Sequence, residues 1–206
     1  MTMPASPAGF LSDPPVDADV QELYDGDREG LGYVANLSRV WAHSPTALKT
    51  LSSAMMLATD LSGLEADERS LVVLATASTM GDSYCSLAYG ARLASAIGED
   101  VTARVVRGDD SRLTPRGQAL AAWAREVARD PSATTPEGVR ALREAGLGDR
   151  QIFGLTLFAA LRIVFSSVND ALGACPDAEL AAKAPHAVLE AIDFGRLPAT
   201  AAATTD

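Results

Sequence analysis

The chain has 206 residues, 48% of them apolar, and it carries a formal net charge of −10 and two cysteines. A domain of this size buries roughly 70% of the surface that its unfolded chain exposes, so it needs no disulfide or metal to fold. The acidity argues against nucleic acid and anionic membranes as partners, because both attract a positive surface.

Both ends of the chain are predicted to be flexible, because residues 1–15 are rich in Pro, Ser and Ala and residues 198–206 read the same way. The N-terminal segment has neither the basic region nor the apolar run of a signal peptide. The longest apolar run, "IFGLTLFAALRIVF", is too short to span a bilayer and contains Arg162. We therefore expect a cytoplasmic protein with free thiols and one domain over residues 16–197.

Between these ends the sequence predicts helices and no convincing strand, because its apolar residues recur with helical spacing and alanine is abundant. Several segments are preceded by a side chain that can cap a helix N-terminus, and three of these capping residues are followed directly by Pro. A helix pair before Gly98 and another after Thr114 suggest a weak internal duplication. We predict a single all-α domain, a helical bundle. The expected helices cover residues 16–29, 45–61, 65–80, 82 onward, 114–130, 135–146, 147–173 and 178–193.

Several stretches follow one another in an informative order: "LGYVANLSRVWAHSPTAL", then "LEADERSLVVLATASTMGDSYCSLAYGARLA", then "FSSVNDALG". In them the chain resembles the carboxymuconolactone decarboxylase and alkylhydroperoxidase D (AhpD) superfamily, and most closely its peroxidase-related branch. The resemblance covers about residues 20–175. It implies an all-helical subunit that works without a cofactor and forms homo-oligomers, with its site near a subunit interface.

The redox motif of that superfamily is altered in this chain. Peroxidase members carry Cys-x-x-Cys, a His four residues after the second Cys, and a Glu twelve residues before the first. The matching positions here hold Ser70, Asp82, Cys85 and Tyr89, so only the second cysteine remains. Glu68 is two residues from the glutamate position, about 200° around a helix, and is not expected to replace it.

These replacements argue against a two-thiol peroxidase. Such an enzyme needs a thiolate, a second thiol that resolves the sulfenic acid, and a group that moves protons. Asp82 cannot form a disulfide, and a tyrosine hydroxyl, with an ordinary pKa of about 10, is a poor base. A helix N-terminus lowers the pKa of Cys85, whereas the Asp82 carboxylate raises it. Cys175 could resolve a sulfenic acid only with its Cα within about 7 Å of that of Cys85.

Asp82, Cys85 and Tyr89 fall on one face of the expected helix and form the candidate catalytic group. In a catalytic interpretation, Asp82 is a general acid or base and Tyr89 donates a hydrogen bond to an enolate or carbonyl oxygen. Cys85 is then a nucleophile or part of the pocket wall. In a structural interpretation they are a helix cap, a small buried residue and a packed ring. The sequence leaves both interpretations open.

Arg162 interrupts the most apolar segment, where an unpaired charge is costly. It could bind a substrate carboxylate in bidentate fashion. It could instead pair with Asp82, with Asp170 or with a partner subunit, or reach water at the helix edge. Two serines are further candidates for substrate contact. Ser70 occupies the glutamate position of the superfamily motif, and Ser166 occupies a position where the superfamily tends to have an asparagine.

The two histidines, His43 and His186, are far apart and have no carboxylate cluster at ligand spacing, so no metal site is expected. No sequence motif for a cofactor is visible. We expect a cofactor-independent enzyme that acts on a small organic substrate by proton transfer, decarboxylation, elimination or cyclisation, with secondary metabolism as one setting for it. The alternatives are a thiol peroxidase that uses Cys85 with an external thiol, and a non-catalytic oligomeric binding protein.

Overall fold

The computed structural model describes residues 9–199, which form eleven α-helices and one short 3-10 turn. The predicted all-α fold is confirmed. Most of the two predicted flexible ends, residues 1–8 and 200–206, lies outside the described residues. The helices are α1 (Ala18–Leu31), α2 (Asn36–Trp41), α3 (Pro45–Ser62), α4 (Ala66–Met80), α5 (Ser83–Ile97), α6 (Glu99–Val106), α7 (Pro115–Arg129), α8 (Pro136–Glu144), α9 (Asp149–Ala171), α10 (Ala178–Lys183) and α11 (His186–Ala191).

The predicted helix starts are confirmed by their caps. Ser44, Asp82, Thr114 and Thr135 each accept a hydrogen bond from the backbone N–H three residues further on, at 2.9–3.4 Å. Each side chain thereby satisfies a donor that the first turn of a helix leaves free. These caps fix where α3, α5, α7 and α8 begin.

Two helix boundaries differ from the prediction. The expected helix over 178–193 is two short helices, because Pro185 has no N–H and disfavours helical backbone at Ala184, whose ψ is 143°. The first helix begins at Ala18 and continues through Gly30 to Leu31, where the chain turns at Gly32 with a φ of +89°. Neither α2 nor α6 was predicted as a helix of its own, because segments of six and eight residues show little periodic pattern.

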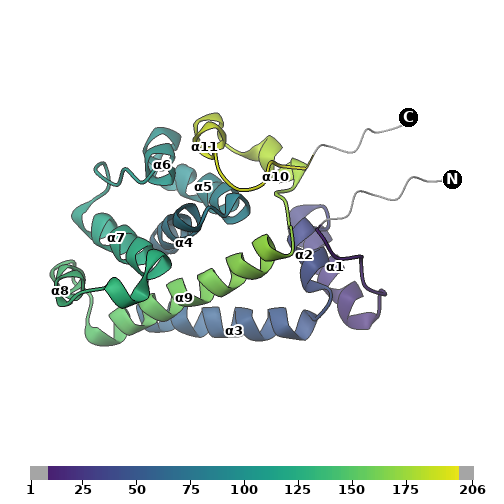
Figure 1. Ribbon diagram of the computed structural model, residues 1–206, viewed down its shortest axis with the longest axis horizontal. Helices are drawn as coiled ribbons and strands as arrows, with labels where there is room; N and C mark the ends of the chain where they lie inside the picture. Colours follow the sequence, from purple (N-terminus) through teal and green to yellow (C-terminus); the bar gives the residue numbers. More distant parts are fainter. Residues whose placement is uncertain (1–8, 200–206) are drawn as a thin grey trace.

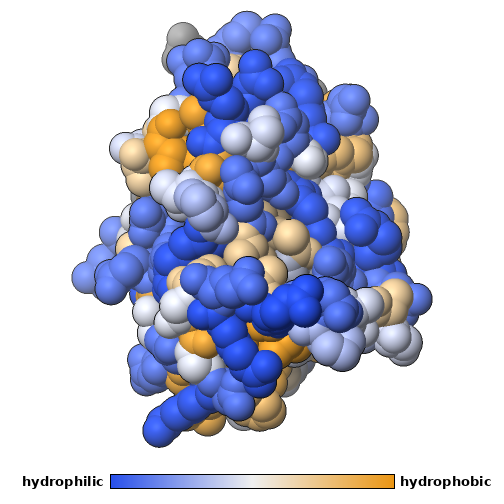
Figure 2. Space-filling model, turned by 90° about the vertical axis from the view of Figure 1, so that its left-hand side faces the viewer, coloured by the Kyte–Doolittle hydropathy of each residue, from blue (hydrophilic) through white to orange (hydrophobic). Residues whose placement is uncertain are grey.

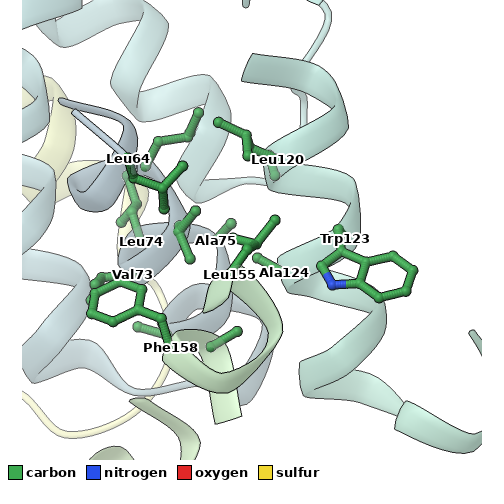
Figure 3. Packing of buried hydrophobic residues seen from close by; sticks show 14 of the residues in the cluster. Leu64, Val73, Leu74, Ala75, Leu120, Trp123, Ala124, Leu155 and Phe158 are labelled. Atoms are coloured by element: carbon green, nitrogen blue, oxygen red, sulfur yellow. The ribbon is translucent and has the colours of Figure 1, made fainter. Parts of the chain in front are cut away.

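α3 and α9 form a long antiparallel pair, and α4 packs against α5, α7 and α9 on the other side of the molecule (Figure 1). Eight consecutive residues of α4, 70–77, are buried, so this helix has no solvent face in its middle. Leu155 and Phe158 of α9 and Trp123 of α7 close the core around it (Figure 3). The predicted internal duplication stays a prediction.

Within the described residues, α9 has the length and apolar composition to cross a membrane, and 44% of its most apolar window is buried inside the molecule. It crosses the middle of the molecule in Figure 1 and contacts α3, α4, α7 and α8. The end of the molecule that carries α8, seen in Figure 2, is largely hydrophilic, with apolar residues in separate small patches.

Candidate functional site

An open cavity of about 960 Å³ lies between α3, α4, α5 and α9. Three of the six predicted site residues line it: Tyr89 from α5, Arg162 from α9 and Ser70 from α4. Serine and methionine side chains of α3 form the opposite wall. The other three predicted residues, Asp82, Cys85 and Ser166, are buried and do not line this cavity.

The start of α5 sets the depth of the catalytic candidates. Gly81 turns the chain with a φ of +78°, and Asp82 caps the new helix by accepting a hydrogen bond from the Cys85 N–H at 2.9 Å. Cys85 therefore lies in the first turn of α5 and is only 2% exposed, whereas Tyr89 lies one turn further on and reaches the cavity. One helix face thus carries both a buried thiol and an accessible phenol.

Arg162 forms the floor of the cavity between two aromatic rings. Its Cζ atom lies 4.9 Å from the ring centroid of Tyr89 and 4.8 Å from that of Phe165. Phe165 is itself stacked on Trp41, with 5.5 Å between centroids, and the Trp41 indole N–H donates to Asn169 Oδ1 at 2.8 Å. This chain of contacts holds the guanidinium in place, because the face of an aromatic ring attracts a cation.

The guanidinium of Arg162 has no carboxylate partner within 4.0 Å in the described part of the chain. The alternative that it pairs with Asp82 or Asp170 is therefore wrong. Its Nη2 lies 3.2 Å from Cys85 Sγ, and its Nη1 lies 3.7 Å from the sulfur of Met55. Its Nε is buried, with no hydrogen-bond partner among residues 9–199. At 5% exposure, this is a buried cation whose polar contacts within that range are with sulfur.

Burial, together with the nearby charge of Asp82, raises the pKa of the Cys85 thiol to about 12. The positive charge of Arg162 and a hydrogen bond with Ser166 act in the opposite direction but do not outweigh burial. The sequence sets the helix N-terminus, which lowers the pKa of this thiol, against the Asp82 carboxylate, which raises it; burial of the thiol is the largest cause of the observed direction. The thiol is therefore protonated at pH 7.

Asp82 is completely buried, and its Oδ2 has no hydrogen-bond partner in the described residues. The charge of Asp82 also affects Asp170. Burial and this charge raise the pKa of Asp170 to about 6, and the positive charge of Arg196 acts in the opposite direction. Asp82 faces the interior at the start of α5 and does not reach the cavity. Its negative charge acts on Cys85 and Asp170.

Cys175, the possible resolving thiol, and Glu68, the residue nearest to the missing glutamate of the redox motif, both make contacts outside the cavity. Cys175 is a free thiol beside Asn36, whose side-chain amide donates to its sulfur at 3.7 Å, and it makes no bond with Cys85. Glu68 accepts from Arg116 at 2.6 Å and from the Glu65 backbone N–H at 3.1 Å, outside the cavity. Neither restores the missing half of the redox motif.

Four residues of the site were missed by the sequence reasoning: Met55, Arg92, Phe158 and Phe165. Arg92 lies over the Tyr89 ring at 4.8 Å, and Met55 and Phe158 line the cavity. Arg92 and Phe165 each follow a predicted residue by three positions, a spacing that places them on the same helix face. Met55 comes from α3, and no signal in the sequence connects it with Arg162.

The order and packing of the helices define the AhpD-like all-α fold, so the resemblance read from the sequence is confirmed at the level of the fold. The structure is similar to that of the alkylhydroperoxidase AhpD core, an uncharacterized peroxidase-related protein from Ralstonia eutropha JMP134. The TM-score is 0.74 and the identity 22%, over 85% of this chain and 96% of that chain. A peroxidase-related protein from Silicibacter sp. TM1040 gives a TM-score of 0.69 and 23% identity over 87% and 97%.

A third solved structure is that of the debrominase Bmp8, as a cysteine-to-alanine variant in complex with 2,3,4-tribromopyrrole. It matches with a TM-score of 0.70 and 12% identity over 90% of this chain and 100% of that chain. No known family model and no curated protein matches the sequence. The fold is therefore shared by proteins whose identity to this chain is low.

Proposed function

We propose that the protein is an enzyme that acts on a small organic molecule in the cavity, without a cofactor and without thiol redox cycling. The observation that carries the proposal is the arrangement of the site. The cavity opens onto the phenol of Tyr89 and the guanidinium of Arg162, whereas the nearby thiol of Cys85 is buried and protonated. A debrominase on the same fold supports a small-molecule substrate.

Tyr89 is the proposed catalytic hydrogen-bond donor, and its hydroxyl would stabilise an enolate or carbonyl oxygen of the substrate as negative charge develops. Arg162 supplies positive charge at the cavity floor, and Ser70 offers a hydroxyl on the α4 wall. Asp82 and Ser166 lie behind the floor, so their proposed part is to hold Cys85 and thereby Arg162 in place. This arrangement suits proton transfer, decarboxylation, elimination or cyclisation.

Turnover of a panel of small carbonyl and carboxylate compounds, followed by mass spectrometry, tests the proposal. The Tyr89→Phe variant keeps the ring over Arg162 and removes only the hydroxyl. We expect it to lose about 10²–10³-fold in rate on any compound that the wild-type protein converts, as for loss of one oxyanion donor. Undiminished turnover by Tyr89→Phe would contradict the role of Tyr89. No turnover of any compound would favour a non-catalytic binding protein.

A second candidate is a thiol peroxidase that uses Cys85 with an external thiol. One observation favours it, because the 3.2 Å contact with Arg162 would stabilise a thiolate once formed. Consumption of tert-butyl hydroperoxide in the presence of dithiothreitol decides between the two candidates. We expect the wild-type protein and a Cys85→Ser variant to be equally slow, and rapid consumption that Cys85→Ser abolishes would establish the peroxidase.

Cysteine labelling gives an independent measure, because Cys175 serves as an internal control in the same chain. At pH 7.5 we expect iodoacetamide to modify the partly exposed Cys175 at least about 100-fold faster than the buried, protonated Cys85. Peptide mapping by mass spectrometry at timed intervals separates the two sites. Preferential labelling of Cys85 would show a reactive thiolate and would count against non-redox chemistry.

We also propose a cytoplasmic homo-oligomer, as the resemblance implied. Its support is the exposed apolar side chains on the outer faces of α3 and α9, and one of them, Met56, also lines the cavity. A subunit that covered this side chain would bring the cavity close to an interface. Light scattering on the purified full chain measures the subunit number, and a monomer at micromolar concentration would contradict this part of the proposal.

A further inference from the structure

We propose that the ligand of the cavity is a small monocarboxylate with an apolar, planar body, and that Arg162 receives its carboxylate group. This inference rests on the proposed function, which takes the cavity as the substrate site, and it adds the chemical class of the substrate. It is drawn from the hydrogen-bonding state of one buried side chain, from the geometry around that side chain, and from the lining of the cavity.

The first step is that the hydrogen-bonding capacity of Arg162 is largely unused. A guanidinium offers five N–H donors, and sulfur is a weak acceptor for them. Within the part of the chain that the structure describes, Arg162 donates only to the sulfur atoms of Cys85 and Met55, and its Nε has no partner. A buried charge without a counter-ion is costly, so an arginine in this state indicates an anion that arrives from outside the chain.

Arg125, another buried arginine, shows how this chain satisfies an arginine that serves the fold. Its Nε and Nη2 donate to both oxygens of Asp110 at 3.0 Å, and Nη2 also donates to the Val105 carbonyl at 2.6 Å. Its Nη1 reaches the Ser78 hydroxyl at 3.1 Å. The contrast sets Arg162 apart, because the two side chains are buried to a similar degree.

The second step is geometric. The rings of Tyr89 and Phe165 lie beside the guanidinium of Arg162, with Cζ to centroid distances of 4.9 and 4.8 Å, so a ligand reaches its N–H groups from the cavity that Arg162 lines. A carboxylate accepts two parallel N–H···O bonds from the edge of a guanidinium. Met55 contacts Nη1 and also lines the cavity, and its side chain is flexible enough to yield to a ligand oxygen.

The third step concerns the rest of the ligand. Beside the floor, the walls offer apolar surface from Met55, Phe158 and Tyr89, which suits a flat hydrocarbon body. Apart from Arg162, the charged side chains of the cavity are the carboxylates of Asp60, Glu65 and Asp67 and the guanidiniums of Arg69 and Arg92, three negative against two positive groups. A second negative charge on the ligand would meet these carboxylates, so one carboxylate is favoured over two.

Binding to the full-length protein tests the inference with benzoate and trans-cinnamate as probes, each paired with its neutral amide, and with phthalate as a dianion. Isothermal titration or ligand-observed NMR measures the dissociation constants. We expect each monocarboxylate to bind at least tenfold more tightly than its amide and than phthalate. Equal binding of carboxylate and amide to the wild-type protein would overturn the inference.

Two variants locate the effect. Arg162→Met removes the charge with little change in side-chain length and should abolish the preference for carboxylate over amide. Arg140→Gln removes an exposed arginine that does not line the cavity and should keep the preference within about threefold. An unchanged preference in Arg162→Met, or its loss in Arg140→Gln alone, would contradict the assignment. Arg162→Lys provides a second test, because it keeps the charge and loses the bidentate edge, and it should bind benzoate at least about tenfold more weakly.

Stability without ligand distinguishes a binding arginine from a structural one. Arg162→Met should unfold within about 3 °C of the wild-type protein, because the charge that it removes has no carboxylate partner among the described residues. A fall as large as that of Arg125→Met would show that Arg162 serves the fold and would overturn the inference. Carboxylate binding without turnover of any compound would leave this inference standing and contradict the proposed function. Turnover of neutral compounds alone, without carboxylate binding, would contradict this inference and leave the proposed function standing.

Discussion

Replacing Arg125 with methionine will lower the free energy of unfolding by about 3–5 kcal/mol, as expected when one partner of a buried ion pair is removed. The change leaves the Asp110 carboxylate without its bidentate partner at 3.0 Å. It also leaves the carbonyl oxygen of Val105 and the hydroxyl of Ser78 without a donor. Arg125 thereby joins α7 to α4, to α6 and to the loop that follows α6, so its loss affects the centre of the fold.

Urea denaturation followed by circular dichroism measures this change. Arg104→Met is the matched control, because Arg104 pairs with Asp109 at 2.8 Å in an exposed ion pair that water already screens. We expect a much smaller effect from the control than from Arg125→Met. A loss of less than about 1 kcal/mol for Arg125→Met would show that the buried network does not stabilise the fold as described.

Gly154→Ala will also lower the free energy of unfolding strongly, because α9 contacts the backbone of α3 at this residue. A Cβ atom there would lie 2.4 Å from the Ser62 backbone N and 2.6 Å from the Leu61 carbonyl carbon. Neither backbone atom can move unless the two helices separate. We expect a loss of about 3 kcal/mol or more, at the upper end of the cost of overpacking a core. The midpoint of urea denaturation gives the measurement.

Gly26→Ala is the control for this substitution. Gly26 also lies within a helix, α1, but nothing in the described structure is within 4 Å of a Cβ atom built on it. The change should stabilise the protein by about 0.5–1 kcal/mol, because alanine favours helix and loses less backbone freedom on folding. Opposite signs for the two variants would confirm that close helix approach matters at Gly154. A similar small effect of both would contradict it.

The helices could be predicted from the sequence wherever a local rule determines them. Capping side chains at Ser44 and Asp82 and the Pro residues after Thr114 and Thr135 mark helix starts through interactions within one turn. α2 escaped prediction because six residues are too few to show a period. The break before Pro185 follows from a local rule as well, and it was overlooked within an otherwise helical pattern.

The site was predictable as a set of residues on one helix face, but the depth of each residue was not. The spacing of Asp82, Cys85 and Tyr89 says that they share a face, yet only Tyr89 reaches the cavity. Depth depends on the helices that cover α5, and these are remote in sequence. The contact between Arg162 and Met55 spans 107 residues, and no spacing rule relates such positions.

The cavity has one firm wall and one compliant wall. On the firm side, α4 buries eight of its 15 residues and α5 buries seven of 15, whereas α3 buries only two of 18. α3 nevertheless packs along α9, with Gly154 against its end, so the compliant part of this wall is its side chains, Met55 and the exposed Met56. Ligands of different bulk could therefore be admitted by moving these two methionines, while the positions of Tyr89 and Arg162 stay fixed. Such a site would select ligands by the positions of their charged and hydrogen-bonding groups, and it would accept ligands of different width.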